Sequence, residues 1–348
     1  MTSPLQQTML TAIEKELQNQ VQRLDQSYTK EFHEMLTYHM GWTGEGAGVN
    51  ATGKRIRPLI TLLSTASINS NYNNEEGKSD KGNWLHAVPA GASIELIHNF
   101  SLVHDDIQDN SELRRGRKTA WVKWGQPMAI NAGDALFVIA YQSMLDLSKH
   151  YPAEIVLQAT NILSEICLKL TQGQFLDMSY ENRNDLSIEE YWHMIGGKTA
   201  SLLSACTQIG SLLGYAKTEK VEAYRLFGYH LGLAFQVQDD VLGIWGDESV
   251  TGKSVASDLV EGKNSLPVLF GLLQNRQFAL RWKQGKINQD EVHQIAKTLE
   301  EEGAKEYADK ISVDETNKAM SYLEQANPQG EAGEAIYQLA NMLLKRNQ

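Results

Sequence analysis

Apolar residues recur every three to four positions over long parts of this chain, which predicts amphipathic helices and not strands. We expect a first helix from Leu10 to about Leu36, and a second from Arg57 to Ser67 with Pro58 in its first turn. Runs of alternating Val, Ile and Thr, which are typical of strands, are scarce, so the fold class is predicted to be all-α. Further helical segments are expected at 85–111, 129–150, 153–180, 188–215 and 221–244, with shorter ones over 274–348.

The pattern shows no boundary that would divide the chain into parts. No stretch rich in proline or serine separates its segments, so we expect residues 1–348 to form one large helical domain. Residues 69–84 are polar and of low complexity, which predicts a mobile surface loop.

Composition and charge exclude several classes of protein. The net charge of −11 argues against a nucleic-acid partner, which would favour a basic surface. Two cysteines, Cys167 and Cys206, provide neither a disulfide framework nor a structural zinc site, which fits a cytoplasmic protein. The N-terminal residues lack the apolar core of a signal peptide, and we find no run of eighteen apolar residues that would predict a transmembrane segment.

Two short acidic motifs stand out, because each ends an apolar helical segment. They are DDIQD at 105–109 and DDVLG at 239–243, followed by Asp247. Residues four apart share a helix face, so Asp105 and Asp109 should project side by side. Like charges this close repel each other in an apolar neighbourhood, so the motif is favourable only where a cation neutralises it.

Magnesium suits such a motif, because it prefers carboxylate, water and phosphate oxygens. Two facing motifs could hold several ions around one diphosphate and neutralise the charge that develops as its carbon–oxygen bond breaks. The first motif has no serine or cysteine nucleophile beside a base, so we expect metal-assisted ionisation and not covalent catalysis. The alternative is a solvated helix end with chance acidic residues, which two copies make less favourable than one.

Basic residues in other segments predict a second anion site. Arginine pairs bind phosphate through forked hydrogen bonds, and lysines act as point charges. Lys54 and Arg57 are three residues apart and are expected on one helical face, while His98 lies two helical turns before Asp105 on the same face. One diphosphate would thus be bound through metal and leave, whereas the other would be held by basic residues and keep its pyrophosphate. The residues expected to hold this second diphosphate are Lys54, Arg57, Arg115 and His98, and further positive charge comes from Arg114, Lys198, Lys253 and Lys263.

These residues resemble the motifs of the trans-isoprenyl diphosphate synthases. Residues 97–109 followed by Arg114-Arg115-Gly116 are similar to their first aspartate-rich region, and residues 235–247 are similar to the second. GKRIRP at 53–58 resembles their motif for isopentenyl diphosphate. Further similar elements are Gly173-Gln174 with Asp177, GGKT at 196–199, TGK at 251–253, Asp258 and Lys263. All of these elements occur in the order that is typical of the family. The resemblance is strongest to the bacterial geranylgeranyl diphosphate synthases.

The resemblance implies a bundle of antiparallel helices around a deep central cavity, a homodimer, and about three Mg²⁺ ions per active site. The reaction it implies joins isopentenyl diphosphate to an allylic prenyl diphosphate by ionisation, condensation and proton loss, with the released pyrophosphate as the base. Metal contacts would come from Asp105, Asp106, Asp109, Asp239 and Asp240, and Lys198 and Arg114 would join the aspartates in catalysis. Substrate contacts would come from Lys54, Arg57, His98, Arg115, Thr199, Gln236, Lys253 and Lys263.

The sequence departs from the family pattern at two positions. Gly243 stands where many members have a third aspartate, although similar DDxxG versions occur among bacterial geranylgeranyl-type synthases. Lys118 replaces the proline that is common after RRGx, and we expect no effect on activity from this change.

Two residues before the first motif bear on product length. Ser101, four residues before Asp105, leaves room on nearly the same helical face, and the bulky Phe100 could act as the floor of an apolar tunnel. This arrangement resembles that of the geranylgeranyl synthases, which predicts a twenty-carbon product. The alternative is that Phe100 only packs against a neighbouring helix.

Two other functions compete with chain elongation. A terpene cyclase also ionises a prenyl diphosphate with a DDxxD motif, but it has no need for GKRIRP, Arg115 or a duplicated motif. A catalytically silent regulatory subunit would be expected to have lost one motif or the basic residues. Transfer to another acceptor, such as an indole or a peptide, is less favoured by the intact isopentenyl diphosphate motif.

Replacing Phe100 with alanine is expected to lengthen the products, because a small side chain would open the floor of the tunnel. Chromatography of the products of the Phe100→Ala variant beside those of the unmodified protein measures this. An unchanged length distribution would show that Phe100 does not limit the chain.

Overall fold

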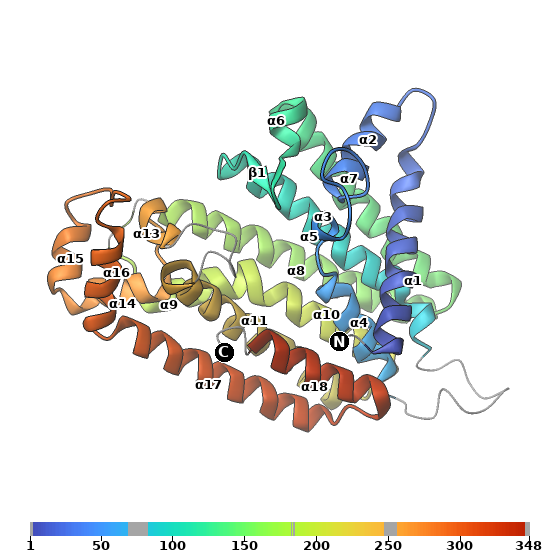
Figure 1. Ribbon diagram of the computed structural model, residues 1–348. Helices are drawn as coiled ribbons and strands as arrows, with labels where there is room; N and C mark the ends of the chain where they lie inside the picture. Colours follow the sequence, from blue (N-terminus) through green and yellow to red (C-terminus); the bar gives the residue numbers. More distant parts are fainter. Residues whose placement is uncertain (1–2, 69–82, 182, 184, 247–255, 345–348) are drawn as a thin grey trace. The chain divides into compact units, whose positions relative to one another are not determined.

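The computed structural model describes the chain apart from residues 1–2, 69–82, 182, 184, 247–255 and 345–348, and its described residues form two compact units (Figure 1). The first unit contains Met1–Ser164, Cys206–Val221 and Pro328–Ile336, and the second contains Glu165–Ala205, Glu222–Asn327 and Tyr337–Gln348. Helices dominate both units, so the predicted all-α class is confirmed. A single domain around a deep central cavity stays a prediction.

The first unit is built around one buried helix. Every residue of α5 from Ala90 to Ile97 is buried, because α1, α4 and α7 pack around it. On α1, Met9, Ile13 and Leu17 lie four residues apart and are fully buried, so they form the apolar stripe that faces the core. The elements of this unit are α1 (Pro4–Val21), η1 (Gln22–Leu24), α2 (Lys30–His39), α3 (Val49–Thr52), α4 (Ile56–Ala66), η2 (Trp84–Ala87), α5 (Val88–Gln108), β1 (Leu113–Arg114), β2 (Arg117–Lys118), α6 (Ala120–Trp124), α7 (Gln126–Leu145), η3 (Asp146–Lys149) and the first part of α8 (Ala153–Tyr180).

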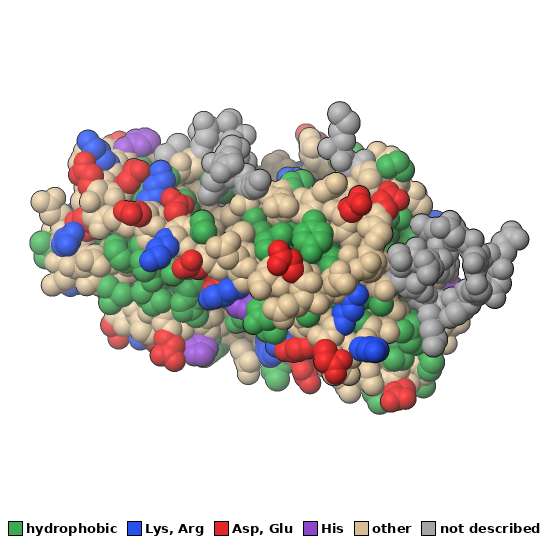
Figure 2. All heavy atoms as spheres, turned by 90° about the horizontal axis from the view of Figure 1, so that it is seen from below, with side chains coloured by type: hydrophobic (Ala, Val, Ile, Leu, Met, Phe, Trp, Pro, Cys, Tyr) green, Lys and Arg blue, Asp and Glu red, His purple; other side chains and the backbone are tan. Residues whose placement is uncertain are grey.

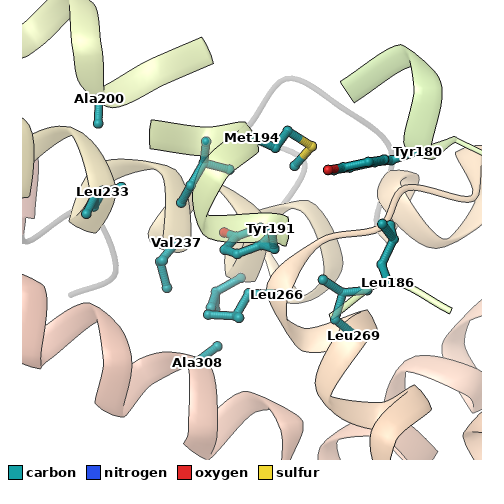
Figure 3. Close-up of a cluster of buried hydrophobic side chains, with 12 residues drawn as sticks. Tyr180, Leu186, Tyr191, Met194, Ala200, Leu233, Val237, Leu266, Leu269 and Ala308 are labelled. Atoms are coloured by element: carbon teal, nitrogen blue, oxygen red, sulfur yellow. The ribbon is translucent and has the colours of Figure 1, made fainter. Parts of the chain in front are cut away.

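The second unit packs around two apolar clusters. Figure 3 shows the first, in which Tyr191, Val237 and Leu266 bring α9, α11 and α14 together. The second cluster surrounds Phe278 and Leu299, which are fully buried. The elements concerned are the rest of α8, α9 (Ile188–Ile195), the π-helix η4 (Gly196–Ala200), α10 (Ser201–Leu213), α11 (Thr218–Trp245), α13 (Ser257–Glu261), α14 (Leu266–Gln274), α15 (Gln277–Trp282), α16 (Val292–Glu301), α17 (Ala304–Ala326) and α18 (Gly330–Leu344), of which α10, α11 and α18 also contribute residues to the first unit.

The predicted helix from Leu10 to Leu36 is wrong in one respect, because the chain leaves the helix between Leu24 and Lys30. The hydroxyl of Thr29 accepts a hydrogen bond from the amide of Gln26 at 3.3 Å and donates to the carbonyl of Leu24 at 2.5 Å. A threonine that bonds nearby backbone groups in this way competes with the helical pattern. The apolar period continues across the break, which is why the sequence pattern did not reveal it.

Other boundaries also differ from the predictions. Residues 69–82 of the predicted loop lie outside the described residues. The last two residues of the prediction are wrong, because Asn83 and Trp84 are buried and Trp84 begins η2. The predicted helix at 188–215 is interrupted by a π-helix at Gly196–Ala200. Helix α14 was missed, because it is apolar on most sides and shows no clear period.

One helix is long and apolar enough to cross a membrane by length and composition alone, although it is not a continuous apolar run. Within the described part of the chain it covers Gln126–Lys149, and 44% of its apolar window is buried in the protein. In the first unit this segment includes α7, which packs against α5. On the face in Figure 2, acidic and basic side chains are interspersed among apolar and uncharged ones.

Candidate functional site

The first acidic motif lies at the C-terminal end of α5, in the first unit. Asp105 is in the last turn, and Asp109 caps the helix with its amide bonded to the carbonyl of Asp105 at 2.8 Å. Asp109 is exposed and Asp105 is half-buried, so both carboxylates can be reached from solvent. The predicted side-by-side placement therefore holds only at the very end of the helix, where Asp109 is already the cap residue.

Asp106 differs from its two neighbours, because it is 2% exposed and points into the protein. Its Oδ1 accepts a hydrogen bond from Nε of Arg114 at 2.8 Å and forms an ion pair with Nη2 of the same side chain at 2.7 Å. Burial raises the pKa of Asp106, and the Arg114 guanidinium opposes this rise. This contact ties the acidic helix end to the basic segment that follows it.

That basic segment is a β-hairpin, which the helical pattern did not predict. Strands Leu113–Arg114 and Arg117–Lys118 pair antiparallel, and Arg115 and Gly116 form the two-residue turn. Both turn residues have positive φ, 53° and 73°, as a type I′ turn requires. Glycine adopts this conformation without strain, whereas for Arg115 the same conformation is unfavourable in free energy.

The hairpin is fastened to the glycine-rich stretch before α4 by two arginines. Arg115 donates to the carbonyl of Ala51 at 2.7 Å, and its guanidinium lies 2.6 Å from where a side chain on Gly53 would begin. Arg117 donates to three carbonyls, those of Tyr38 at 2.8 Å, Glu45 at 2.9 Å and Thr43 at 2.6 Å. Its guanidinium also lies 4.0 Å from the centre of the Tyr38 ring. Arg117 belongs to the basic segment after the first acidic motif, but it was not among the predicted site residues, since the sequence does not distinguish it from a solvated surface arginine.

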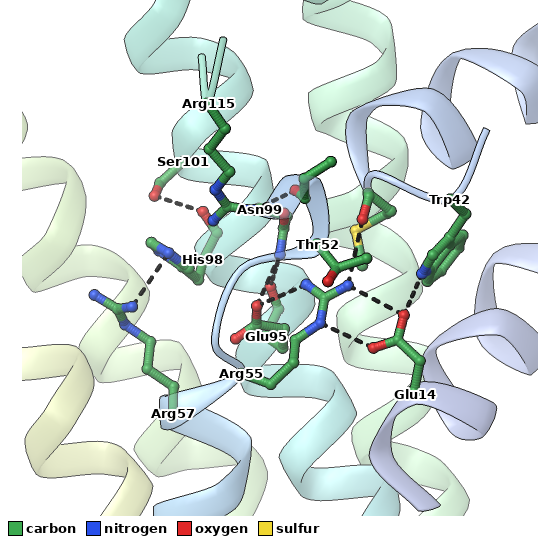
Figure 4. A network of polar contacts seen from close by, with 12 residues as sticks. Glu14, Trp42, Thr52, Arg55, Arg57, Glu95, His98, Asn99, Ser101 and Arg115 are labelled. Atoms are coloured by element: carbon green, nitrogen blue, oxygen red, sulfur yellow. Dashed lines mark hydrogen bonds and ion pairs between the residues drawn. The ribbon is translucent and has the colours of Figure 1, made fainter. Parts of the chain in front are cut away.

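Arg57 and His98 meet near this point, where α4 lies beside α5 (Figure 4). Nη1 of Arg57 lies 3.1 Å from Nε2 of His98, and because arginine only donates, Nε2 must be the acceptor. Burial and the positive charges of Arg57, Arg115, Arg114 and Arg55 hold the pKa of His98 well below its usual range. His98 is therefore neutral, and it orients Arg57 without adding a charge of its own.

The crowding of positive charge is the main electrostatic feature of the first unit. Burial, together with Arg55, Arg114 and Arg57, lowers the pKa of Arg115, although Glu95 opposes this. Nε of Arg57 is buried and forms no hydrogen bond among the described residues. A group of arginines that repel one another, one of which has an N–H without an acceptor, is what we expect of an anion-binding site before the anion binds.

Arg55 anchors the loop that precedes α4. It is 5% exposed and adopts the left-handed conformation, with φ of 48°. Its guanidinium donates to Glu95 at 2.9 Å and to Glu14 at 3.0 Å, which joins the loop to α5 and α1 (Figure 4). Burial acts to lower the pKa of Arg55, and the two carboxylates raise it. Helix α4 begins only at Ile56, so the exposed Lys54 lies in the loop and does not share a helical face with Arg57 as predicted.

His39 is a second histidine in this region, and sequence reasoning missed it. It lines a cavity of about 20 Å³ together with Asn99, Asp106, Arg114 and Arg115. Burial and the nearby arginines lower its pKa to about 3, so the ring is neutral. Its Nε2 is buried and has no hydrogen-bond partner within the described structure. No motif in the sequence marks this position.

The second acidic motif lies near the end of α11, in the second unit. Asp239 is exposed, whereas Asp240 is 6% exposed. Oδ2 of Asp240 accepts hydrogen bonds from the Tyr191 hydroxyl at 2.7 Å and from the amide of Leu266 at 2.9 Å. Its Oδ1 accepts from Nε2 of Gln236 at 2.9 Å. Burial raises the pKa of Asp240 to about 7, against the effect of these hydrogen bonds.

These contacts favour a positioning role for Asp240, since both of its oxygens are occupied within the unit. The Leu266 amide belongs to the first turn of α14 and has no partner within its own helix, so Asp240 caps that helix from α11. Through Gln236 it also reaches Thr199, whose hydroxyl donates to Oε1 of Gln236 at 2.7 Å. The predicted role of Asp240 as a metal ligand remains untested.

Lys198 and Thr199 are presented by the π-helix at Gly196–Ala200. Single π turns inside longer helices are frequent at functional sites. The turn packs directly on the backbone of α8, because a side chain on Gly173 would begin 2.1 Å from the amide of Lys198. Lys198 forms an ion pair with Asp177 of α8. The two sequence elements that contain these residues, both of which resemble family motifs, are therefore in contact.

A hollow of about 600 Å³ adjoins the same glycines in the second unit, and none of the predicted site residues lines it. Lys263 is half-exposed and pairs with Glu261 at 2.7 Å and with Asp258 at 3.4 Å. Both carboxylates raise its pKa, although burial opposes this. The predicted Lys253, like Asp247, lies outside the described residues.

Phe100 points from α5 toward α7. Its ring centre lies 5.0 Å from that of Phe137 and 5.0 Å from that of His104. The hydroxyl of Ser101 donates to the carbonyl of His98 at 2.9 Å. Packing of Phe100 against a neighbouring helix is therefore present, and a limit on product length remains a prediction.

The donor set fits a magnesium ion in part. Asp105, Asp109 and Asp239 offer hard carboxylate oxygens on accessible helix ends. In the described part of the chain, no three carboxylate, imidazole or thiol groups come together to hold an ion by themselves. An ion bound at either motif would therefore take one or two carboxylates, with water and phosphate oxygens completing its shell.

Residues 47–301 match the family model for polyprenyl synthetase. A short chain isoprenyl diphosphate synthase of Methanothermobacter thermautotrophicus is 37% identical over 301 residues, which cover 86% of this chain and 88% of that protein. A (2E,6E)-farnesyl diphosphate synthase of Mycobacterium bovis is 36% identical over 285 residues, covering 79% and 75%.

Solved structures give the same result. A geranylgeranyl pyrophosphate synthetase of Pyrococcus horikoshii has a TM-score of 0.83 at 30% identity, covering 97% of this chain and 96% of the other. A polyprenyl synthase of Caulobacter crescentus, complexed with calcium and isoprenyl diphosphate, has a TM-score of 0.78 at 25% identity, covering 97% and 96%.

Replacing Arg55 with alanine should lower the free energy of unfolding by about 3–5 kcal/mol, because it leaves the carboxylate of Glu95 buried without its partner. The matched control is Arg183→Ala, since Arg183 also bridges two carboxylates, Asp185 and Glu190, but on an exposed surface. This control should change stability little. Denaturant unfolding followed by circular dichroism compares them, and equal losses would contradict the importance of the buried pair.

Proposed function

Because this chain belongs to the polyprenyl synthetase family and is a prenyltransferase, we propose that it joins isopentenyl diphosphate to an allylic prenyl diphosphate. The bond between C1 and oxygen of the allylic substrate breaks, and pyrophosphate leaves with the electron pair. The double bond of isopentenyl diphosphate then attacks the allylic cation, and loss of one proton restores a double bond. The released pyrophosphate would accept that proton.

The observation that carries this proposal is the concentration of arginines beside the first acidic motif. Arg57 has a buried donor without a partner, and the pKa of Arg115 is lowered by burial and by the neighbouring arginines. A diphosphate bound here would relieve this repulsion and accept the unsatisfied hydrogen bond. We assign Lys54, Arg57 and Arg115 to isopentenyl diphosphate, with the neutral His98 orienting Arg57.

A different set of residues would bind the allylic diphosphate. We assign this role to Lys198, Thr199, Gln236, Arg114 and Lys263, and to Lys253, which lies outside the described residues. Thr199 and Gln236 are hydrogen-bonded to each other and anchored on Asp240, so their positions are defined before substrate binds. Lys198 is paired with Asp177, which would keep its side chain extended toward the ligand.

We propose Asp105, Asp109 and Asp239 as contacts for magnesium, which would neutralise the charge of the departing pyrophosphate. The exposure of these carboxylates supports this assignment, as does the calcium in the Caulobacter crescentus relative. Asp106 contributes by holding Arg114 toward the same helix end. The number of ions, about three, rests on the family resemblance.

We further propose a product near twenty carbons. Relatives named as farnesyl diphosphate synthases and relatives named as geranylgeranyl synthases both match this chain, so membership of the family does not decide the length of the product. Phe100, packed between Phe137 and His104, would be the residue that limits the tunnel.

A cytoplasmic homodimer completes the proposal. Ile130, Val138 and Leu145 are each about half-exposed and share one face of α7, and a second copy could cover this apolar face. The terpene cyclase and the silent subunit remain alternative functions, and no described contact favours either of them.

Purified protein incubated with isopentenyl diphosphate and each allylic starter of five, ten or fifteen carbons should release pyrophosphate and longer prenyl diphosphates, detected by mass spectrometry. A chelator should abolish the reaction, and so should Asp105→Ala, with little change in the circular dichroism spectrum. Turnover of an allylic diphosphate alone would indicate a cyclase. Failure with all starters and magnesium would indicate a silent subunit.

Replacing Arg117 with alanine should raise the KM for isopentenyl diphosphate by about tenfold and leave the KM for the allylic substrate nearly unchanged. The reason is that Arg117 fastens the hairpin bearing Arg115 to the loop before α4. The exposed Arg276, replaced in the same way, is the control and should change neither constant. Steady-state kinetics measure both, and an equal rise in both KM values would contradict this role.

A further inference from the structure

Gly243, at the third acidic position of the second motif, has no room for a side chain. An ideal Cβ there would lie 2.1 Å from Oδ2 of Asp258, 2.5 Å from its Cγ and 3.0 Å from its Oδ1, and Cβ contacts under 3.0 Å essentially do not occur. Gly243 lies within α11 and its φ is not positive, so the Asp258 side chain, and not the backbone conformation, restricts the space for a side chain at this position. The carboxylate of Asp258 therefore occupies the place where the side chain of residue 243 would begin.

Packing of the neighbouring residues holds Asp258 in this place. Ala256 and Leu259 are each 1% exposed and belong to the same apolar cluster as Ile244 of α11. Asp258 lies between them in the sequence and is 6% exposed. Its backbone carbonyl also accepts a hydrogen bond from the amide of Lys263 at 2.9 Å. The approach of its carboxylate to Gly243 thus follows from the way this segment is anchored on α11.

The two aspartates of the second motif, Asp239 and Asp240, differ in their exposure and in their contacts. Asp239 lies four residues before Gly243, so the two positions share a helix face, and Asp239 is exposed. Asp240 is occupied by Tyr191, Gln236 and Leu266. The charge of Asp258 is close enough to contribute to the raised pKa of Asp240. Asp239 and Asp258 are therefore the pair on this face of α11 that could act together.

We propose that Asp258 supplies the carboxylate that Gly243 lacks, and that it contacts, directly or through water, the divalent cation bound by Asp239. This inference rests on the proposed function and identifies which residues complete its second acidic motif. A pair of carboxylates with water and phosphate oxygens is a sufficient ligand set for magnesium. Lys263, 3.4 Å from Oδ1 of Asp258, would balance the charge of the carboxylate before the cation binds. The chain would thus keep the function of a third aspartate while supplying it from another segment.

A transfer of the carboxylate between the two positions tests the proposal. The variants are Asp258→Ala, Gly243→Asp and the double variant Gly243→Asp/Asp258→Ala, in the full-length protein. Binding of Mn²⁺ in the presence of inorganic pyrophosphate, followed by the electron paramagnetic resonance of free Mn²⁺, is independent of turnover. Asp258→Ala should weaken this binding by about 10- to 100-fold, as loss of a metal-contacting or supporting carboxylate typically does. The double variant should recover it to within about threefold of the unmodified protein, because the carboxylate is then restored from position 243.

Controls separate a ligand role from a structural one. Asp258→Asn keeps the shape of the side chain, and it should weaken Mn²⁺ binding as Asp258→Ala does while preserving the circular dichroism spectrum. The exposed Asp290, changed to alanine, should leave binding unaffected. Unchanged Mn²⁺ binding in Asp258→Ala and Asp258→Asn would overturn the proposal, and so would a double variant that binds no better than Asp258→Ala. If the unmodified protein binds Mn²⁺ with pyrophosphate but forms no prenyl product, the proposed function fails while this inference can still be judged.

Discussion

The repulsion among the closely spaced arginines of the first unit is the constraint on which the candidate site depends. Arg55, Arg57, Arg114 and Arg115 lower the pKa of His98 together with burial, so they act on one another over short distances. Such a group is stable only because carboxylates balance part of its charge. Glu95 and Glu14 pair with Arg55, and Asp106 pairs with Arg114. The remaining positive charge is left for an anionic ligand.

Hydrogen bonds within each unit accompany the burial of one aspartate in each acidic motif. Asp106 and Asp240 belong to the two acidic motifs, yet both are nearly inaccessible and accept hydrogen bonds from named groups within their units. Their neighbours Asp109 and Asp239 are exposed. In each motif, one aspartate thus holds protein groups in position, and another faces solvent, where a cation could bind.

Glycine also lets other segments approach the helix backbone closely at two positions. Gly173 lets the π-helix bearing Lys198 and Thr199 contact α8, and Gly243 lets Asp258 contact α11. A side chain at either position would collide with its neighbour, so a substitution there would move functional groups and not only lower stability. Glycines of this kind have no functional side chain, but they influence where the functional side chains of other residues lie.

The sequence by itself determined the all-α class, most helix positions, the two acidic motifs and the family, because helical periodicity and the spacing of charged residues are local properties. The start and end of α8 at Ala153 and Tyr180 were predicted correctly from this pattern alone. Only the tertiary structure decided that Lys54 lies in a loop, that Asp240 caps α14, and that Arg117, His39 and Asp258 belong beside the predicted residues. These facts depend on contacts between segments distant in the chain, which burial and packing select and which leave no periodic signal in the sequence.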